Sequence, residues 1–218
     1  MQEWFSRLVK KLVELPWFMW AIVAGLLAFG IVLMVAGRKT RWTARMLAHA
    51  AICLALSFVL SCIRLWRMPQ GGSITPGSML PLMMFAYAYG TLPGLLAGVA
   101  YGLLQILQGA EMVHPLQLLL DYVLAFGVIG LAGCLRGITK LPENLRFTLG
   151  VIIAGLLRTL CSTLSGAVFF AEYTPAGQNA VIYSLVYNLT SLGIDTFICA
   201  ALAAVPKIGA LAARMKPT

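Results

Sequence analysis

Apolar stretches long enough to cross a lipid bilayer follow one another along almost the whole chain, from Trp17 to Val205. A transmembrane helix needs about 17–25 mostly apolar residues. Of the 218 residues, 61% are hydrophobic and only 11% are charged, whereas a soluble domain carries about 25% charged residues. We therefore expect an all-α, polytopic transmembrane helical bundle of about six or seven spans, with no soluble domain beside it.

The positive charge lies between the spans. The formal net charge is +9, and Lys and Arg cluster at 38–45, at 136–146 and after position 206. The positive-inside rule places such segments in the cytoplasm. We accordingly expect a cytoplasmic basic tail at 207–218 and outer loops at 68–78 and 171–179. This distribution accounts for the basic charge without a nucleic-acid partner.

Two segments precede the main membrane domain. Residues 1–16 alternate apolar and basic side chains at helical spacing, which is typical of an amphipathic helix lying at the membrane surface. Residues 17–37 are long enough to span the bilayer, and the basic segment after them contains no convincing cleavage site. We therefore expect an extra, retained transmembrane span there rather than a signal peptide. The membrane domain itself is expected at 44–206.

One carboxylate, Asp121, stands in the middle of an apolar run. An ionised Asp in hydrocarbon costs roughly 2.5–3.5 kcal/mol on insertion scales, so such a group usually faces a cavity, a partner or a substrate. The alternative is that a neighbouring helix satisfies Asp121 and that the residue only holds the bundle together. We favour a role in binding a cationic ligand, because Tyr122 follows directly with an aromatic ring and a polar hydroxyl group.

The expected topology brings further polar and aromatic side chains to the outer ends of the spans. Ser162 and Phe170 approach the outer face on one helix, and Tyr183 and Asn188 leave it on the last. A cavity that combines these side chains with Asp121 suits a flat, cationic, hydrogen-bonding small molecule, because a carboxylate and aromatic faces both attract a cation.

Three other features carry structural expectations. Residues 68–78 are rich in Pro and Gly and should form an outer loop that lines or covers the site. Gly94, Gly98 and Gly102 form a small-residue stripe at which helices can pack closely. Arg158 lies inside a span, so we expect it to be paired or to extend towards the cytoplasmic face.

Motifs of several enzyme classes are absent from the sequence. There is no G-x-x-x-x-G-K-[ST] nucleotide-binding motif, no G-x-S-x-G, no H-E-x-x-H and no C-x-x-C. His49 and His114 are too far apart in the chain to suggest a metal site. We expect neither a metal nor a cofactor. An intramembrane enzyme that uses Asp121 and Asp195 as an acid pair remains an alternative.

Several blocks resemble a known family. They are MPQGGSITPGSMLPL (68–82), GLLAGVAYGLLQILQG (94–109), HPLQLLLDYVLAF (114–126), GLAGCLRG (130–137), LSGAVFFAEYTPAG (164–177) and YSLVYN (183–188). In this order they are similar to the thiamine-specific substrate-binding components of bacterial energy-coupling factor transporters. The resemblance covers residues 44–205. It implies six spans, a thiamine site near the outer face of the cell membrane, a membrane coupling protein and two cytoplasmic ATPases as partners.

The resemblance also implies roles for individual residues. Asp121 falls at the family's acidic position near the thiazolium cation, and Tyr122 falls at the neighbouring pocket tyrosine. Phe170 falls at the aromatic position that stacks on the aminopyrimidine ring. Tyr183 and Asn188 fall at ligand positions of the last helix.

Two further groups follow from the same resemblance. Gly71, Gly72 and Ser73 match the loop that closes over the ligand. Ala51 and Ala55, four residues apart, match the small-residue contact with the coupling protein, although from the residues alone they could equally pack within the bundle.

The chain departs from the family at three places. Ser162 stands where the family commonly has a His that hydrogen-bonds the pyrimidine end, so Ser162 would reach the ligand through a water molecule. Glu111 stands at a position that is often aromatic and would add a second negative charge near the cation. These two changes leave a thiamine precursor or relative open as the substrate. The span at 17–37 is an addition with no assigned role.

Three other functions remain alternatives. A proton-coupled secondary transporter of a small organic cation would use Asp121 as its proton site and would need no ATPase. An intramembrane enzyme would form a covalent product, and a structural membrane subunit would bind no small molecule.

Overall fold

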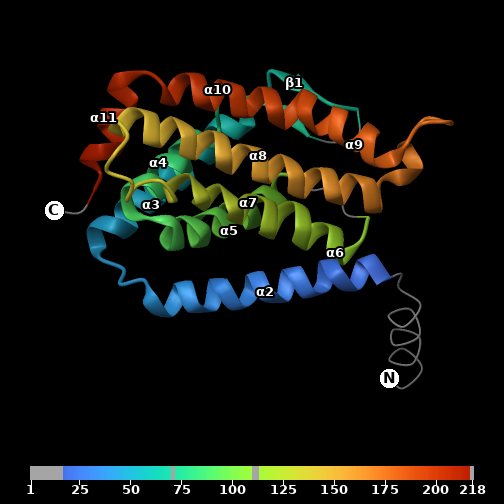
Figure 1. The fold of residues 1–218 in the computed structure, drawn as a ribbon, viewed down its shortest axis with the longest axis horizontal. Coiled ribbons are helices and arrows are strands. Elements are labelled where there is room, and N and C mark those ends of the chain that lie inside the picture. Colours follow the sequence, from blue (N-terminus) through green and yellow to red (C-terminus); the bar gives the residue numbers. More distant parts are fainter. Residues whose placement is uncertain (1–16, 70–71, 110–112, 217–218) are drawn as a thin grey trace.

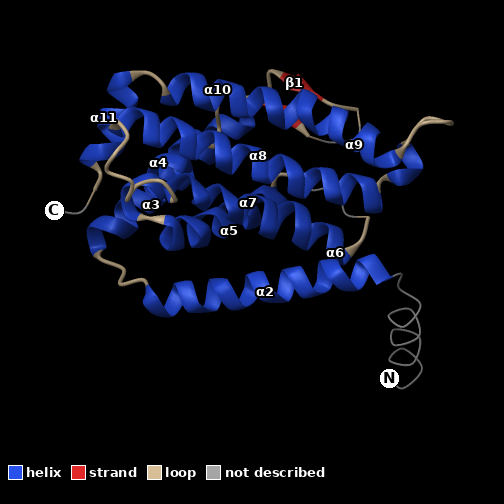
Figure 2. Ribbon diagram, viewed as in Figure 1, coloured by secondary structure: helices blue, strands red, loops and turns tan. Residues whose placement is uncertain are grey.

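The computed structural model describes residues 17–69, 72–109 and 113–216, and in them the protein is a bundle of helices with one short β ribbon (Figures 1 and 2). The expected amphipathic helix at 1–16 lies outside the described residues. The first helices are α2 (Trp17–Lys39) and α3 (Ala44–Cys62). The strands β1 (Trp66–Arg67) and β2 (Ser73–Ile74) pair antiparallel; β2 lies within the expected outer loop at 68–78, and β1 directly precedes that loop.

The rest of the bundle consists of α-helices together with two π-helices and two 3₁₀ helices. Helices α4 (Leu80–Tyr89) and α5 (Thr91–Leu107) are followed by α6 (Pro115–Leu118), the π-helix η1 (Leu119–Leu124), α7 (Ala125–Gly127) and the 3₁₀ helix η2 (Val128–Gly133). Then come α8 (Glu143–Phe169), η3 (Ala171–Tyr173), α9 (Ala180–Asn188), the π-helix η4 (Leu189–Gly193), α10 (Ile194–Ala203) and α11 (Pro206–Arg214).

Within the described residues, five helical segments are long and apolar enough to cross a membrane: 21–39, α3, Pro115–Gly133, α8 and Ala180–Ala203. Helices α4 and α5 are shorter and equally apolar. Apart from α2, these segments make a six-helix core. The predicted all-α membrane bundle is therefore confirmed.

Helix α4 lies at the centre of the core. Eight of its ten residues are buried, and it packs against α3, α5, η2, α8 and α11. A short helix that is apolar on every side is suited to such an enclosed position, because it leaves no polar face to solvate.

The glycine stripe on α5 explains how the neighbouring helix comes close enough to form a site. A Cβ atom on Gly98 would collide with the carbonyl oxygen of Phe126, and one on Gly102 would collide with that of Tyr122. Gly94 lies in the same way against Ala86 of α4. The predicted close packing is therefore present, and it holds the segment containing Tyr122 directly on α5.

Helix α2 lies along one side of the core, against α5 and η1 (Figure 1). Its main insertion into the core is the ring of Phe29, which rests against Gly127. Ile22 is its only buried hydrophobic residue among those whose side chains are described. The helix is an addition to the core rather than part of its packed interior.

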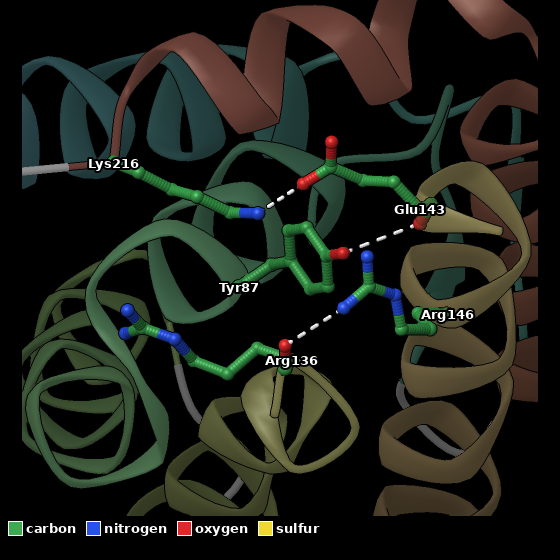
Figure 3. A network of polar contacts seen from close by, with 5 residues as sticks. All are labelled: Tyr87, Arg136, Glu143, Arg146 and Lys216. Carbon is green, nitrogen blue, oxygen red and sulfur yellow. Dashed lines mark hydrogen bonds and ion pairs between the residues drawn. The ribbon is translucent and has the colours of Figure 1, made fainter. Parts of the chain in front are cut away.

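The C-terminal helix α11 lies at one end of the bundle (Figure 1), and Figure 3 shows the basic residues near it. In Figure 3, Lys216 pairs with the carboxylate of Glu143, and the hydroxyl of Tyr87 donates to the Glu143 carbonyl at 3.2 Å. Arg146 donates to the carbonyl of Arg136 at 3.0 Å. Part of the segment expected as a basic tail is thus helical, and α11 packs on α4 and α8.

Candidate functional site

A cavity of about 450 Å³ lies among the helices of the bundle. It is lined by side chains from α5, from the segment α6–η1–α7, from α8, from the segment α9–η4–α10 and from the loop that contains β2. This volume falls within the range of about 300–1,000 Å³ that is usual for small-molecule sites.

Most of the side chains proposed from the sequence line this one cavity. They are Asp121, Tyr122, Ser162, Phe170, Tyr183 and Asn188, together with Gly72 and Ser73 of the loop. Glu111 and Gly71 lie outside the described residues. Ala51 and Ala55 are not in the cavity; both are exposed on α3.

Asp121 is held by two neutral donors. Gln117 Nε2 and Ser165 Oγ each lie 2.8 Å from its Oδ2 atom. Within the described residues Oδ2 alone receives hydrogen bonds, so Oδ1 remains available to a ligand. Asp121 sits in the π-helix η1, and single wide turns of this kind are frequent at functional sites.

The facing wall is formed by α8 and α9. Asn188 Nδ2 donates to the carbonyl oxygens of Ser184 at 2.9 Å and of Ser162 at 3.3 Å. Ser184 Oγ donates to the carbonyl of Thr163 at 2.8 Å, an approach that the absence of a side chain on Gly166 allows. These bonds fix the two helices together and use the amide nitrogen of Asn188, so its amide oxygen is the group that can receive a ligand donor.

Aromatic rings surround the acidic group from several elements. Tyr183 and Tyr187 of α9 have ring centroids 6.2 Å apart, and Tyr122 and Phe126 are stacked at 6.1 Å. Phe170 caps α8 and contributes a fifth ring. Aromatic faces carry negative charge density, so this wall favours a flat cationic ligand.

The loop over the cavity is anchored to α10. The backbone N–H and the hydroxyl of Thr75 donate to Asp195 Oδ1 at 3.2 and 2.7 Å. The hydroxyl of Ser78 lies 2.8 Å from that of Thr75 and donates to it, because the single hydroxyl proton of Thr75 goes to Asp195. The buried carboxylate of Asp195 is thereby satisfied, and the β2 end of the loop is fixed at the edge of the cavity.

Arg158 is paired with an aromatic ring and not with an acid. Within the described residues no carboxylate lies within 4.0 Å of its guanidinium group, and the side chain lines the cavity instead of reaching the cytoplasmic end. The guanidinium lies over the ring of Phe126, 4.1 Å from its centroid. The ring of Phe126 is therefore the partner of this charge, and the distance between the two residues in the sequence concealed the pair.

Sequence reasoning missed the residues that support the site. Gln117 precedes Asp121 by four residues, and this helical spacing is a usable signal for a side-chain hydrogen bond. Ser165 and Thr75 gave no such signal, because their partners lie on distant segments.

The fold and the cavity together define a class: a multi-pass helical membrane protein that encloses a small-molecule site, as solute transport proteins do. A family model described as thiamine transporter protein matches residues 47–213. The chain therefore belongs to this thiamine transporter family of the bacterial cell membrane. It is a transport protein rather than an enzyme.

Individual relatives agree with this family. The chain is 37% identical over 165 residues to thiamine transporter ThiT of Bacillus subtilis, a match that covers 71% of this chain and 85% of that protein. It is 30% identical over 122 residues to thiamine transporter ThiT of Lacticaseibacillus paracasei, covering 50% and 61%. The solved structure of ThiT from Listeria monocytogenes is similar, with a TM-score of 0.63 and 27% identity over 75% of this chain and 96% of that one.

Proposed function

We propose that this chain is the substrate-binding membrane component of an energy-coupling factor importer and that it captures thiamine from outside the cell. The observation that carries the proposal is the cavity in which Asp121 and several aromatic rings meet, in a chain of the thiamine transporter family. Thiamine combines a permanent thiazolium cation with a flat, hydrogen-bonding aminopyrimidine, and the cavity offers a partner for each.

Different residues of the cavity wall bind the two rings of thiamine. Oδ1 of Asp121 faces the thiazolium cation, with Tyr122 beside it. Phe170 stacks on the aminopyrimidine ring, and Tyr183 and the amide oxygen of Asn188 complete the binding of that end. A carboxylate held by neutral donors keeps its full charge for the ligand, so it serves a cation better than an ion-paired carboxylate would.

Ser162 and Glu111 set the preference between thiamine and its precursors or relatives. The hydroxyl of Ser162 reaches the pyrimidine through a water molecule, and Glu111, which lies outside the described residues, supplies a second negative charge for the cation. Residues 71–73 close over the bound ligand. The fixed anchor of Thr75 on Asp195 supports this role, since it confines the motion to the part of the loop that precedes Thr75.

Energy for uptake comes from partner subunits. The chain has no Walker A motif, so we propose a membrane coupling protein and two cytoplasmic ATPases as partners. Ala51 and Ala55 lie exposed on α3, where a helix of the coupling protein can approach closely. The basic end that contains Arg136, Arg146 and Lys216 faces the cytoplasm by the positive-inside rule, and the cavity then faces outwards.

Two experiments test this function. Titration of the purified chain with thiamine, followed by tryptophan fluorescence or calorimetry, should give saturable binding to one site, and mass spectrometry should identify thiamine as a co-purifying ligand. An absence of thiamine binding would contradict the proposal. In vesicles, uptake should require co-expressed coupling and ATPase subunits; uptake by the isolated chain driven by a proton gradient would instead favour a secondary transporter.

The partner surface has its own test. Leucine at both Ala51 and Ala55 should abolish uptake in the assembled complex and leave thiamine affinity within threefold. Ala201→Leu is the matched control, because Ala201 is equally exposed but lies on α10. Equal losses in both variants would argue against a specific contact at α3.

A further inference from the structure

A second cavity, separate from the central one, lies where the additional helix α2 meets the core. Its volume is about 450 Å³. It is lined by the segment that joins α2 to α3, by the start of α3 and by residues 89–93, where α4 turns into α5. None of the described residues that line the central cavity belongs to this set. The second cavity therefore has no part in the site described above.

The second cavity is positively charged, and no acid balances it. Lys39 and Arg41 line it, and the described lining residues include no Asp or Glu. A Cβ atom on Gly90 would lie 3.0 Å from Nη1 of Arg136, so a third cation is adjacent. The ion pair found in the described part of the chain uses Glu143, and Figure 3 shows that the guanidinium of Arg136 points away from this residue. The charge of the cavity thus favours an anion.

Hydrogen-bond donors without partners meet at the same place. The hydroxyl oxygen of Thr40 is buried and has no hydrogen-bond partner within the described residues. Helix α5 begins beside it, and its N-cap residue, Gly90, has no side chain to cap the helix. The first N–H groups of a helix lack intrahelical partners, and their dipoles favour an anion. Because Pro93 has no N–H group, Thr91 and Leu92 supply these donors.

The neighbouring helices place the second cavity at the membrane surface. Ala21–Lys39 and Ala44–Cys62 are both long and apolar enough to span the bilayer, so the short segment between them lies where the chain leaves it. Trp42 in this segment is exposed, as is typical of the interface between lipid and water. The basic residues assign this surface to the cytoplasmic side, where anionic lipids create a negative surface potential.

Apolar side chains continue from the charged residues towards the bilayer centre. Val35 lies one helical turn from Lys39, and Leu47 lies one turn from Thr43, so each pair shares a helix face. Val35 is 41% exposed and Leu47 is 53% exposed. A free anion would leave this apolar surface uncovered, whereas the acyl chains of a lipid would cover it.

We propose that this cavity is a binding site for an anionic phospholipid of the cytoplasmic leaflet. Lys39 and Arg41 bind the lipid phosphate, and the hydroxyl of Thr40 and the first N–H groups of α5 donate to its oxygens. Basic pockets between transmembrane helices on this side of a membrane suit such headgroups. The bound lipid joins the end of α2 to α5 and so gives the additional helix a role. This inference does not depend on the identity of the transported ligand.

The test compares phosphatidylglycerol with phosphatidylcholine on the purified full chain in detergent micelles. Native mass spectrometry counts the retained lipid, and the thermal midpoint of the protein is recorded at each lipid concentration. We expect phosphatidylglycerol to bind with at least tenfold higher apparent affinity and to raise the thermal midpoint, because it binds the folded protein.

A matched pair of double variants separates this site from general attraction to a basic surface. Lys39→Gln with Arg41→Gln should reduce the preference for phosphatidylglycerol at least fivefold. The control, Lys207→Gln with Arg214→Gln, removes one Lys and one Arg from exposed positions of α11 and should change the preference less than twofold.

Thr40→Val removes the unpaired hydroxyl with little change of shape. Without lipid, this variant should have a higher thermal midpoint than the wild type, because a buried hydroxyl without a partner is destabilising. With phosphatidylglycerol, the rise in midpoint should be smaller than in the wild type, since the hydroxyl then has a phosphate oxygen as its acceptor.

Three outcomes would overturn the inference. Equal retention of the two lipids by the wild-type protein is the first, and it needs no variant. The second is an equal loss of preference in both double variants. The third is stabilisation by inorganic phosphate or glycerol phosphate as large as that by phosphatidylglycerol, which would identify a site for free phosphate and not for a lipid.

Discussion

Replacing Asp121 by Asn tests the central electrostatic argument with little change of shape. Both hydrogen bonds that the protein donates to Asp121 end on Oδ2, at 2.8 Å each. The amide oxygen of an Asn side chain can take that place and keep both bonds. Its NH₂ group then occupies the position of Oδ1 and faces the ligand. The substitution therefore removes the negative charge and places a weakly positive group next to the cation.

The size of the effect follows from the distance of closest approach. Two unit charges about 4 Å apart interact by about 4 kcal/mol at an effective dielectric constant of 20. Part of this attraction is offset by the desolvation of both groups. We expect Asp121→Asn to weaken thiamine binding by about 1.4–3 kcal/mol, which corresponds to roughly ten- to 150-fold in Kd.

Calorimetry with two ligands separates charge from shape. The second ligand is a neutral analogue in which carbon replaces the positively charged ring nitrogen of thiamine. Asp121→Asn should weaken binding of thiamine but change binding of the neutral analogue less than threefold, with the thermal midpoint of the protein nearly unchanged. Equal losses for both ligands, or an unchanged affinity for thiamine, would refute the assignment of Asp121 as the partner of the cation.

Three further predictions concern other parts of the site. Ser162→His should tighten thiamine binding, because the longer side chain reaches the pyrimidine directly; weaker binding in a titration would favour a relative of thiamine with a different ring. Gly102→Ala should destabilise the fold by about 1–3 kcal/mol through overlap with the carbonyl of Tyr122, seen as a lower thermal midpoint, whereas the same change at the exposed Gly25, where nothing lies within 4 Å, should not. Asp195→Ala leaves the N–H of Thr75 without its acceptor, at a cost of about 1–3 kcal/mol; it should raise the thiamine dissociation rate in stopped-flow measurements, and an unchanged rate would show that the loop anchor has no part in retention.

Much of the architecture could be predicted from sequence, because apolar length and small-residue spacing act locally. The stripe from Gly94 to Gly102 on α5 makes the close contacts that its spacing indicated. Asp121 could be singled out for the same reason: one charge in an apolar run is visible without any knowledge of its neighbours.

What escaped prediction depends on contacts between distant segments. The ring of Phe126 beneath Arg158 and the bond from Thr75 to Asp195 each join residues that no local pattern connects. The two π-helices leave no mark in composition either, since the same apolar residues occupy ordinary helical turns elsewhere in the chain.

These two π-helices, η1 and η4, border the same cavity from separate spans. Each wide turn adds about one residue to the winding, and one residue corresponds to roughly 100° of rotation in a regular helix. The wide turn therefore rotates one half of each span about the helix axis relative to the other half. One half can be tuned for bundle packing while the other keeps its side chains aimed at the ligand. Substitutions in the half of a span that packs in the bundle can thus accumulate without turning the cavity-lining side chains of the other half away from the ligand.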